Sequence, residues 1–203
     1  MKPVVISPAD HDPREPGVLG GLFAAGLERY HVRKPDWTCA RLKSLLSSWP
    51  SEWRARIVLH QHHELVAPLG LGGRHWRDDD TAPAAPEGDR FTSRSCHDLA
   101  TLRDALGRFD AVFFGPVFPS VSKPGHGPLP ETDLAAVSAL LTERNAAGRR
   151  TRVLALGGIT ATTAPRARAL GFDEVAVLGA IWQAADPVQA FAELQDSPTR
   201  HAA

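Results

Sequence analysis

Residues 152–181 read RVLALGGITATTAPRARALGFDEVAVLGAI, and this stretch decides the fold class. The apolar run at 152–156 predicts a buried strand, the two glycines after it predict a turn, and a helical pattern follows. A second apolar run at 174–178 predicts the next strand. Strand, helix and strand in this order indicate a parallel βαβ unit, because a parallel pair needs a long crossover connection.

The same alternation continues toward the N-terminus and predicts about eight strands separated by helices. Further strands are expected at 4–6, 29–33, 57–60, 73–76, 90–95 and 111–114, and helices at 17–27, after Thr38 as N-cap, at 65–69, 97–106 and 131–145, and from 179 to about 194. Eight units in 203 residues favour a single (β/α)8 TIM barrel over a doubly wound sheet, which usually has five or six strands. We expect one domain at 1–195 and a disordered tail at 196–203.

The composition excludes several function classes. The chain has 23 Lys+Arg and 23 Asp+Glu, so its net charge favours neither nucleic acid nor an anionic membrane as a partner. Its two cysteines are too few for a disulfide framework and match no zinc pattern. The apolar run at 4–6 is far shorter than the roughly 7–15 residues of a signal peptide, which predicts a cytoplasmic protein.

Polar side chains gather where the predicted strands end, and a barrel of this class places its active site there. The candidates at these ends are five of the nine histidines, His31, His60, His62, His75 and His97, together with Arg33 and Ser95. A loop at 115–130 is longer than the about 4–6 residues of an ordinary connection. It adds Ser120, Ser122 and Lys123, whose hydroxyls and ammonium are donors suited to an anion.

A phosphate site is predicted by Gly157, Gly158 and Gly179, which follow the last two strands. Barrels of this class often bind phosphate at these two loops, where a backbone N–H must approach the anion without a Cβ in the way. Two kinds of metal site are also open. His60 and His62 could share a zinc ion, and a carboxylate from the acidic run at 78–80 could hold Mg²⁺.

Taken together, the motifs resemble the thiamine phosphate synthase/TenI superfamily over residues 4–182. The resembling segments are HVR at 31–33, GRH at 73–75, SCH at 95–97, DAVFFGPVFPSVSK at 110–123, LALGGIT at 154–160 and GFDEVAVLGAI at 171–181. The resemblance implies a (β/α)8 barrel. Its synthase members join a hydroxymethylpyrimidine diphosphate to a thiazole phosphate with Mg²⁺ and release pyrophosphate, whereas its TenI members isomerise the thiazole ring.

The resemblance also implies roles for single residues. Arg33 would contact the diphosphate, Ser95 would lie near the departing pyrophosphate, and Asp80 would be a Mg²⁺ ligand. The loop with Ser120, Ser122 and Lys123 matches a Thr-x-Thr-Lys loop of the family, and the thiazole-phosphate site matches Gly157, Gly158 and Gly179. We assign Arg33, Ser95, Lys123 and His62 to catalysis, and His31, His60, His75 and His97 with the loop serines and the glycines to substrate binding.

Three positions depart from the family pattern. His60 and Gln61 stand where the synthase has Asn-Asp, and Pro35 replaces a lysine for which Lys34 is a candidate substitute. Pro116 stands where the tautomerase has its histidine, and His31, His62 or His97 could then serve as the base. We therefore expect a synthase-like enzyme. A thiazole tautomerase and a non-catalytic thiazole-phosphate or thiamine-phosphate binding protein are the alternatives, and a homodimer is the expected assembly.

Overall fold

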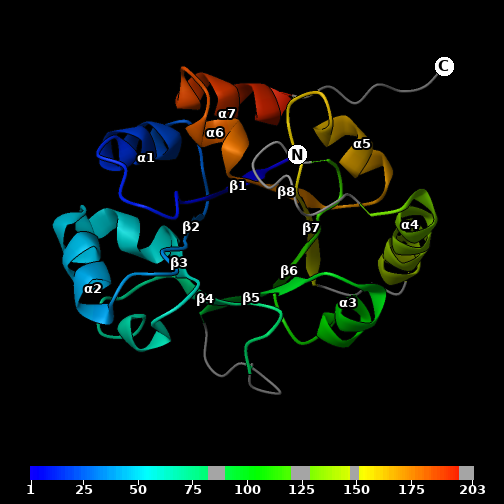
Figure 1. Cartoon of the computed structure of the whole chain (residues 1–203), viewed down its shortest axis with the longest axis horizontal. Helices are drawn as coiled ribbons and strands as arrows, with labels where there is room; N and C mark the ends of the chain where they lie inside the picture. The colour runs from blue at the N-terminus through cyan, green and yellow to red at the C-terminus, as the bar shows by residue number, and fades with distance from the viewer. Residues whose placement is uncertain (82–89, 120–128, 147–150, 197–203) are drawn as a thin grey trace.

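The computed structural model describes residues 1–81, 90–119, 129–146 and 151–196, and these contain a closed eight-stranded barrel ringed by helices (Figure 1). All strand pairings are parallel, and β1 pairs with β8, so the sheet has no open edge. The strands are β1 (Pro3–Ile6), β2 (Tyr30–Val32), β3 (Ile57–Leu59), β4 (Gly73–Trp76), β5 (Phe91–Cys96), β6 (Ala111–Phe114), β7 (Arg152–Leu156) and β8 (Glu174–Val177). The predicted (β/α)8 TIM barrel is confirmed.

The helices lie outside the strands and cover the barrel wall (Figure 1). They are α1 (Glu15–Ala24), α2 (Cys39–Ser48), α3 (Leu99–Ala105), α4 (Glu131–Ala146), α5 (Ala164–Ala169), α6 (Gly179–Trp182) and α7 (Pro187–Asp196), with short 3-10 helices η1 (Ser51–Arg56) and η2 (His63–Leu65). None of the helices in the described part of the chain has the length and apolarity needed to cross a lipid bilayer.

Alternating side chains on each strand build two separate cores. In β6, Phe113 belongs to a small cluster with Val4, Ile6 and Leu154 inside the lumen, which is the space enclosed by the eight strands. Its neighbour Phe114 belongs to the large cluster between the strands and the helices. Both faces of the strands are thus buried, which explains the nearly continuous apolar runs in the sequence.

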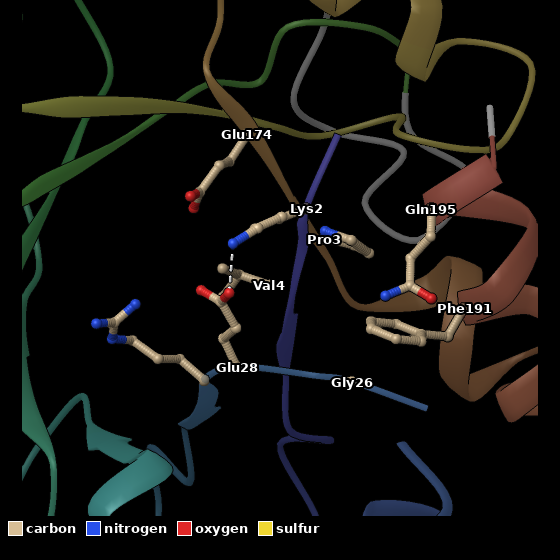
Figure 2. A pocket seen from close by; sticks show the side chains of 9 residues that line it. Lys2, Pro3, Val4, Gly26, Glu28, Glu174, Phe191 and Gln195 are labelled. Atoms are coloured by element: carbon tan, nitrogen blue, oxygen red, sulfur yellow. Dashed lines mark hydrogen bonds and ion pairs between the residues drawn. The ribbon is translucent and has the colours of Figure 1, made fainter. Parts of the chain in front are cut away.

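Charged and aromatic side chains fill the lumen at the amino ends of the strands. The guanidinium of Arg29 lies 4.2 Å from the ring centroid of Phe91, and Arg152 Nη1 donates to Glu174 Oε1 at 2.6 Å. Beside this charged layer is a small cavity of about 80 Å³, where Lys2 and Glu28 form an exposed ion pair (Figure 2). Active sites of such barrels lie at the opposite end, so we assign this end to stability.

Most element boundaries were predicted to within a few residues, and the differences have local causes. Thr38 is the N-cap of α2 as expected, because its side chain accepts a hydrogen bond from the Arg41 N–H at 3.3 Å. The helix expected at 65–69 is instead the 3-10 helix η2 followed by turns. α1 begins earlier than expected, at Glu15, since Pro16 needs no hydrogen-bond partner in a first turn.

The C-terminal region also differs from the expectation. The single helix predicted after Gly179 is two helices, α6 and α7, and the second begins at Pro187, where a proline fits the first turn. Asp196 closes α7 and so belongs to the barrel. Residues 197–203 of the predicted tail lie outside the described residues, and the domain limits stay a prediction.

Candidate active site

Arg33 stands at the carboxyl ends of the strands, which we call the mouth of the barrel, directly after β2. Its backbone is clamped by Ser7, the residue directly after β1. The Arg33 N–H donates to Ser7 Oγ at 2.8 Å, and Ser7 Oγ lies 3.1 Å from the Arg33 carbonyl oxygen. The parallel register of Ile6 with His31 brings these two segments together. A fully buried serine therefore fixes where the arginine side chain leaves the backbone.

The guanidinium of Arg33 is partly buried and has no hydrogen-bond or ion-pair partner among the described residues. The guanidinium lies close enough to His60 and His75 to affect their pKa values. Burial lowers the pKa of His60 and of His75, and the positive charge of Arg33 adds to the lowering at both. An arginine without a carboxylate partner at the mouth keeps its N–H groups available for bidentate binding of a phosphate group.

Lys34 does not substitute for the missing family lysine at the mouth. Its ammonium is fully buried, donates to Glu15 Oε2 at 2.7 Å and to the Asp10 carbonyl oxygen at 2.9 Å. Tyr30 Oη donates to the other oxygen of Glu15 at 2.6 Å. These bonds hold the Lys34 ammonium between β2 and α1. The ammonium is therefore not available to a ligand at the mouth.

Two glycine turns lie at the mouth beyond β7 and β8. Gly157 and Gly158 have positive φ angles of 92° and 62°, a region that glycine enters without strain. A Cβ on Gly158 would lie 2.3 Å from the carbonyl oxygen of Pro119 in the β6–α4 loop. Gly179 is the first residue of α6. The predicted phosphate loops are thus brought to one side of the mouth, and Gly158 also has a packing reason to be glycine.

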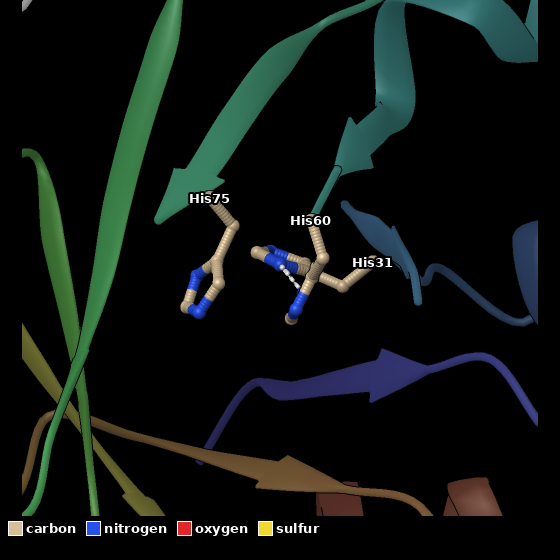
Figure 3. A group of neighbouring side chains, drawn as sticks. All are labelled: His31, His60 and His75. Carbon is tan, nitrogen blue, oxygen red and sulfur yellow. Dashed lines mark hydrogen bonds between the residues drawn. The ribbon is translucent and has the colours of Figure 1, made fainter. Parts of the chain in front are cut away.

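Three of the five histidines predicted at the rim lie instead inside the lumen (Figure 3). His31 and His75 are fully buried, and His60 is 5% exposed. The prediction was wrong about their exposure, because inward alternation on β2 and β4 turns these rings toward the barrel axis rather than toward solvent. Because β2, β3 and β4 are neighbours in the barrel, the inward side chains of His31, His60 and His75 meet in the lumen.

The lumen histidines bond to each other and to two serines of β5. His31 Nδ1 lies 3.1 Å from His60 Nε2, while His75 Nδ1 and Nε2 lie 2.8 Å and 2.9 Å from the Oγ atoms of Ser93 and Ser95. Burial lowers the pKa of His75 to about 3 and those of His31 and His60 well below the usual value. A general base needs a pKa near the working pH, so His31 is poorly suited to that role.

The remaining two histidines are tied to backbone carbonyls. His62 has a left-handed backbone with φ of 55°, donates from Nε2 to the Trp37 carbonyl at 2.8 Å and lies near Glu64. His97 donates from Nδ1 to the Gly115 carbonyl at 2.5 Å. Both rings therefore hold loops of the mouth in place in this conformation. Ser95, in β5, is partly buried. The predicted anion-binding residues of the β6–α4 loop lie outside the described residues; they are Ser120, Ser122 and Lys123.

Comparison with known proteins decides the family. Residues 4–181 match the family described as thiamine monophosphate synthase. The chain belongs to this family. A curated thiamine-phosphate synthase of Methylobacillus flagellatus is 36% identical over 177 residues, which cover 83% of this chain and 79% of the relative.

Solved structures agree with the fold. A thiamine phosphate pyrophosphorylase from Bacteroides thetaiotaomicron superposes with a TM-score of 0.75 at 24% identity and covers 97% of both chains. One from Pyrococcus furiosus gives a TM-score of 0.76 at 19% identity, covering 97% of this chain and 94% of its own. At these identities the likeness supports the barrel of the thiamine monophosphate synthase family, and the activity rests on the sequence relatives.

The Mg²⁺ ligand predicted for this family member, Asp80, is bonded to Arg77, whereas Asp78 Oδ1 is buried without a hydrogen-bond partner among the described residues. Both oxygens of Asp80 bond to Arg77, with Oδ2 accepting from the backbone N–H at 2.7 Å and Oδ1 from Nη2 at 2.9 Å. The positions after β3 carry an imidazole, His60, and an amide, Gln61, rather than a carboxylate. Mg²⁺ prefers an octahedral set of oxygen ligands. The ligand role of Asp80 stays a prediction.

Sequence reasoning missed two parts of this site. The first is Ser7, which clamps Arg33 and whose only signal was its place directly after a strand, before Pro8. The second is Ser93, which bonds His75 from the interior of β5. Alternation along 91–96 places Ser93 and Ser95 on one face of the strand, and that pattern could have indicated a polar lumen.

Proposed function

We propose that this chain is a thiamine-phosphate synthase, which joins a hydroxymethylpyrimidine diphosphate to a thiazole phosphate and releases pyrophosphate. Family membership over residues 4–181 and the curated relatives support the activity. The structural observation that carries the proposal is Arg33 at the mouth, whose backbone is bonded to Ser7 and whose guanidinium has no partner among the described residues. Two anionic substrates need such a cation.

In this reaction the bond from the methylene carbon of the pyrimidine to the diphosphate oxygen breaks, and a bond from that carbon to the thiazole nitrogen forms. The electron pair of the broken bond leaves with pyrophosphate. We assign Arg33 to binding the diphosphate. A positioned donor that faces the developing negative charge lowers the energy of the transition state in which pyrophosphate leaves. Ser95 adds a hydroxyl donor beside it, with its Oγ oriented by His75. Lys123, Ser120 and Ser122 are proposed to complete the anion site.

The second phosphate is proposed to bind at Gly157, Gly158 and Gly179. These residues start the loops after β7 and β8, where barrels of this class commonly bind phosphate through backbone N–H groups. A separation of the two anion sites, with Arg33 after β2 and the glycines after β7 and β8, leaves the mouth between them for the two rings. The roles of His60, His62, His75 and His97 in substrate binding or catalysis remain proposals of the same kind.

The alternative activities receive less support. A tautomerase needs a base with a pKa near the working pH, and burial lowers the pKa of His31 well below its usual value. His62 and His97 are bonded to carbonyl oxygens. A binding protein without catalysis would keep the glycine turns and Arg33 but form no product, so the assay for synthase activity decides between these readings.

The test incubates purified protein with both phosphorylated precursors over a range of Mg²⁺ concentrations and follows thiamine phosphate by chromatography. We expect product and an equal amount of pyrophosphate. No product at any Mg²⁺ concentration would overturn the synthase proposal. Supplying the unisomerised thiazole phosphate alone and following the ring isomer then separates a tautomerase from a binding protein. Mg²⁺ dependence, a cytoplasmic location and a homodimer are further parts of the proposal, and size-exclusion chromatography with light scattering tests the last.

A further inference from the structure

The three lumen histidines form a cluster with the donor set of a metal site. His31 comes from β2, His60 directly follows β3, and His75 comes from β4, so three neighbouring strands contribute one imidazole each. One ring nitrogen of each lies within 4.8 Å of those of the other two. Figure 3 shows the three side chains directed into the space between the strands.

We propose that His31, His60 and His75 bind one divalent transition-metal ion of the Zn²⁺ class inside the barrel lumen. This site is separate from the Mg²⁺ expected from the family resemblance, because it uses only imidazole nitrogens. Its existence does not depend on the proposed synthase activity.

The geometry of the first two ligands suits such an ion. Zn²⁺ lies about 2.0–2.1 Å from histidine nitrogens in proteins. His31 Nδ1 and His60 Nε2 are 3.1 Å apart, so one ion at that distance from both would make an N–metal–N angle of about 95–102°, which a small shift of the rings would open to the tetrahedral value. In the metal-free protein these two nitrogens form a hydrogen bond, with one ring donating and the other accepting.

The third ligand requires a change of partner. The rings of His60 and His75 are stacked, with centroids 3.9 Å apart and an angle of 23° between planes, so their lone pairs do not yet converge. His75 has a serine hydroxyl on each nitrogen. Turning the ring replaces one serine by the ion and leaves the other as the outer hydrogen bond that metal-bound histidines usually make.

The chemistry of the cluster selects the type of ion. Imidazole suits Zn²⁺, Cu²⁺ and Ni²⁺, whereas Mg²⁺ and Ca²⁺ prefer oxygen ligands. Burial holds the pKa of all three histidines below the usual value, so their lone pairs are not blocked by protons near neutral pH. His31 Nε2 is buried without a hydrogen-bond partner among the described residues, which indicates a ring not optimised for hydrogen bonding alone.

Access to the site is from the mouth. His60 is the one member of the cluster with any exposed surface, and it follows the carboxyl end of β3. Three protein ligands leave a fourth position, which in open zinc sites is taken by water or by an oxygen of a ligand. A dication there also faces the region where we place the anionic substrates.

The test uses the full chain, stripped of metal by dialysis against EDTA. Calorimetric titration with ZnCl₂ is expected to show one tight ion per chain, and Co²⁺ is expected to give the visible absorption of a tetrahedral complex. His31→Gln and His60→Asn should weaken binding more than about 100-fold, beyond the 10–100-fold typical of outer-partner loss. Ser93→Ala keeps all three ligands and should weaken it by that smaller factor.

The matched control is His62→Asn, since His62 belongs to a second group of possible ligands with Cys39 and Glu64 near the surface. This variant should bind Zn²⁺ as the wild type does. Loss of binding in His62→Asn with retention in His31→Gln would overturn the proposal, as would the absence of stoichiometric binding in the wild type.

A measurement on the unchanged protein covers the case in which a lumen variant does not fold. X-ray absorption of the Zn²⁺ complex should show nitrogen or oxygen neighbours at about 2.0–2.1 Å and the scattering pattern of several imidazoles. A sulfur neighbour at about 2.3 Å would place the ion at Cys39 and refute the lumen site. None of these readouts uses substrate, so failure of this proposal and failure of the synthase proposal are distinguishable.

Discussion

The Lys34 ammonium lies 2.7 Å from Glu15 Oε2 in a region where the two side chains are 0% and 3% exposed. Tyr30 occupies the second carboxylate oxygen from the opposite side. The two charges of this group are thus paired with each other, and both carboxylate oxygens accept hydrogen bonds from protein donors. Because Lys34 follows Arg33 directly, the buried pair fixes the start of α1 against the backbone that carries the proposed diphosphate ligand.

Removing one partner of this pair should be strongly destabilising. Glu15→Ala leaves the Lys34 ammonium buried without a counter-charge, and breaking a buried pair costs about 3–5 kcal/mol. The control is Glu28→Ala, which breaks the exposed pair with Lys2 and should cost no more than about 1 kcal/mol. Urea unfolding followed by circular dichroism measures both. An equal loss of unfolding free energy in the two variants would contradict the claim that the buried pair stabilises the fold more than the exposed pair.

Arg33→Ala should abolish most of the activity while leaving the fold intact, because the guanidinium has no partner in the described structure to lose. Loss of one positioned donor typically lowers kcat about 10²–10³-fold. Steady-state kinetics of pyrophosphate release measures the effect. Arg103→Ala, on the exposed side of α3, is the control and should leave the rate unchanged. An Arg33→Ala enzyme with wild-type kcat/KM would remove Arg33 from the site.

Gly158→Ala and Gly70→Ala separate backbone strain from close packing. The two glycines have nearly equal φ angles of 62° and 66°, so each alanine should cost about 1–2 kcal/mol from the backbone alone. Only at Gly158 would the Cβ also meet a carbonyl oxygen, that of Pro119 at 2.3 Å, whereas nothing lies within 4 Å at Gly70. We expect Gly158→Ala to lose more stability and to weaken binding of thiamine phosphate, measured by calorimetry, and Gly70→Ala to bind normally.

The stability of the metal-free protein should fall as the pH falls below about 6.5. The pKa of His75 is about 3 in the folded protein, against 6.5 unfolded, and burial lowers the pKa of His31 and His60 too. In this window the unfolded chain binds protons that the folded chain does not. Between these two pKa values each histidine changes the free energy of unfolding by about 1.4 kcal/mol per pH unit. The stabilising contribution is fully present above pH 6.5 and is lost as the pH falls.

Urea unfolding between pH 7 and pH 5 in the presence of EDTA measures this slope. His31→Gln removes one of the three protons taken up on unfolding, so its slope should be shallower than that of the wild type by the contribution of one histidine. A pH-independent free energy of unfolding in the wild type would contradict this prediction, because it would show that the lumen histidines bind protons as readily in the folded state as in the unfolded chain.

The fold could be predicted from the sequence because strand and helix signals are local. The apolar runs at 111–114 and 152–156 match β6 and β7 at both ends, since residues buried on both faces leave little choice of pattern. The boundaries of α1 and of the region 65–69 depended on long-range contacts instead. Pro16 suits the first turn of α1, and Glu15 beside it is bonded to Lys34 and Tyr30, two partners that the sequence near Glu15 does not indicate.

The sequence indicates which residue types lie at the carboxyl ends of the strands, but not how deeply each side chain is buried in the lumen. Strand ends correctly gathered Arg33, Ser95 and the glycines at one end of the barrel. The same reasoning placed His31 and His75 at the rim, because a pattern of alternating residues does not reveal whether a side chain lies one layer below the opening. The backbone position of Arg33 and the burial of Lys34 depend on Ser7 and Glu15, which lie 26 and 19 residues away in the chain.

Arg29 on Phe91 and Arg152 with Glu174 fill the lumen at the amino ends of the strands. A metal ion bound by the lumen histidines is therefore expected to enter from the carboxyl ends, where Arg33 and the glycine turns lie. If substrates bind at that end as proposed, they would lie over the path of the ion. We then expect the ion to bind before the substrates and to exchange slowly while they are bound.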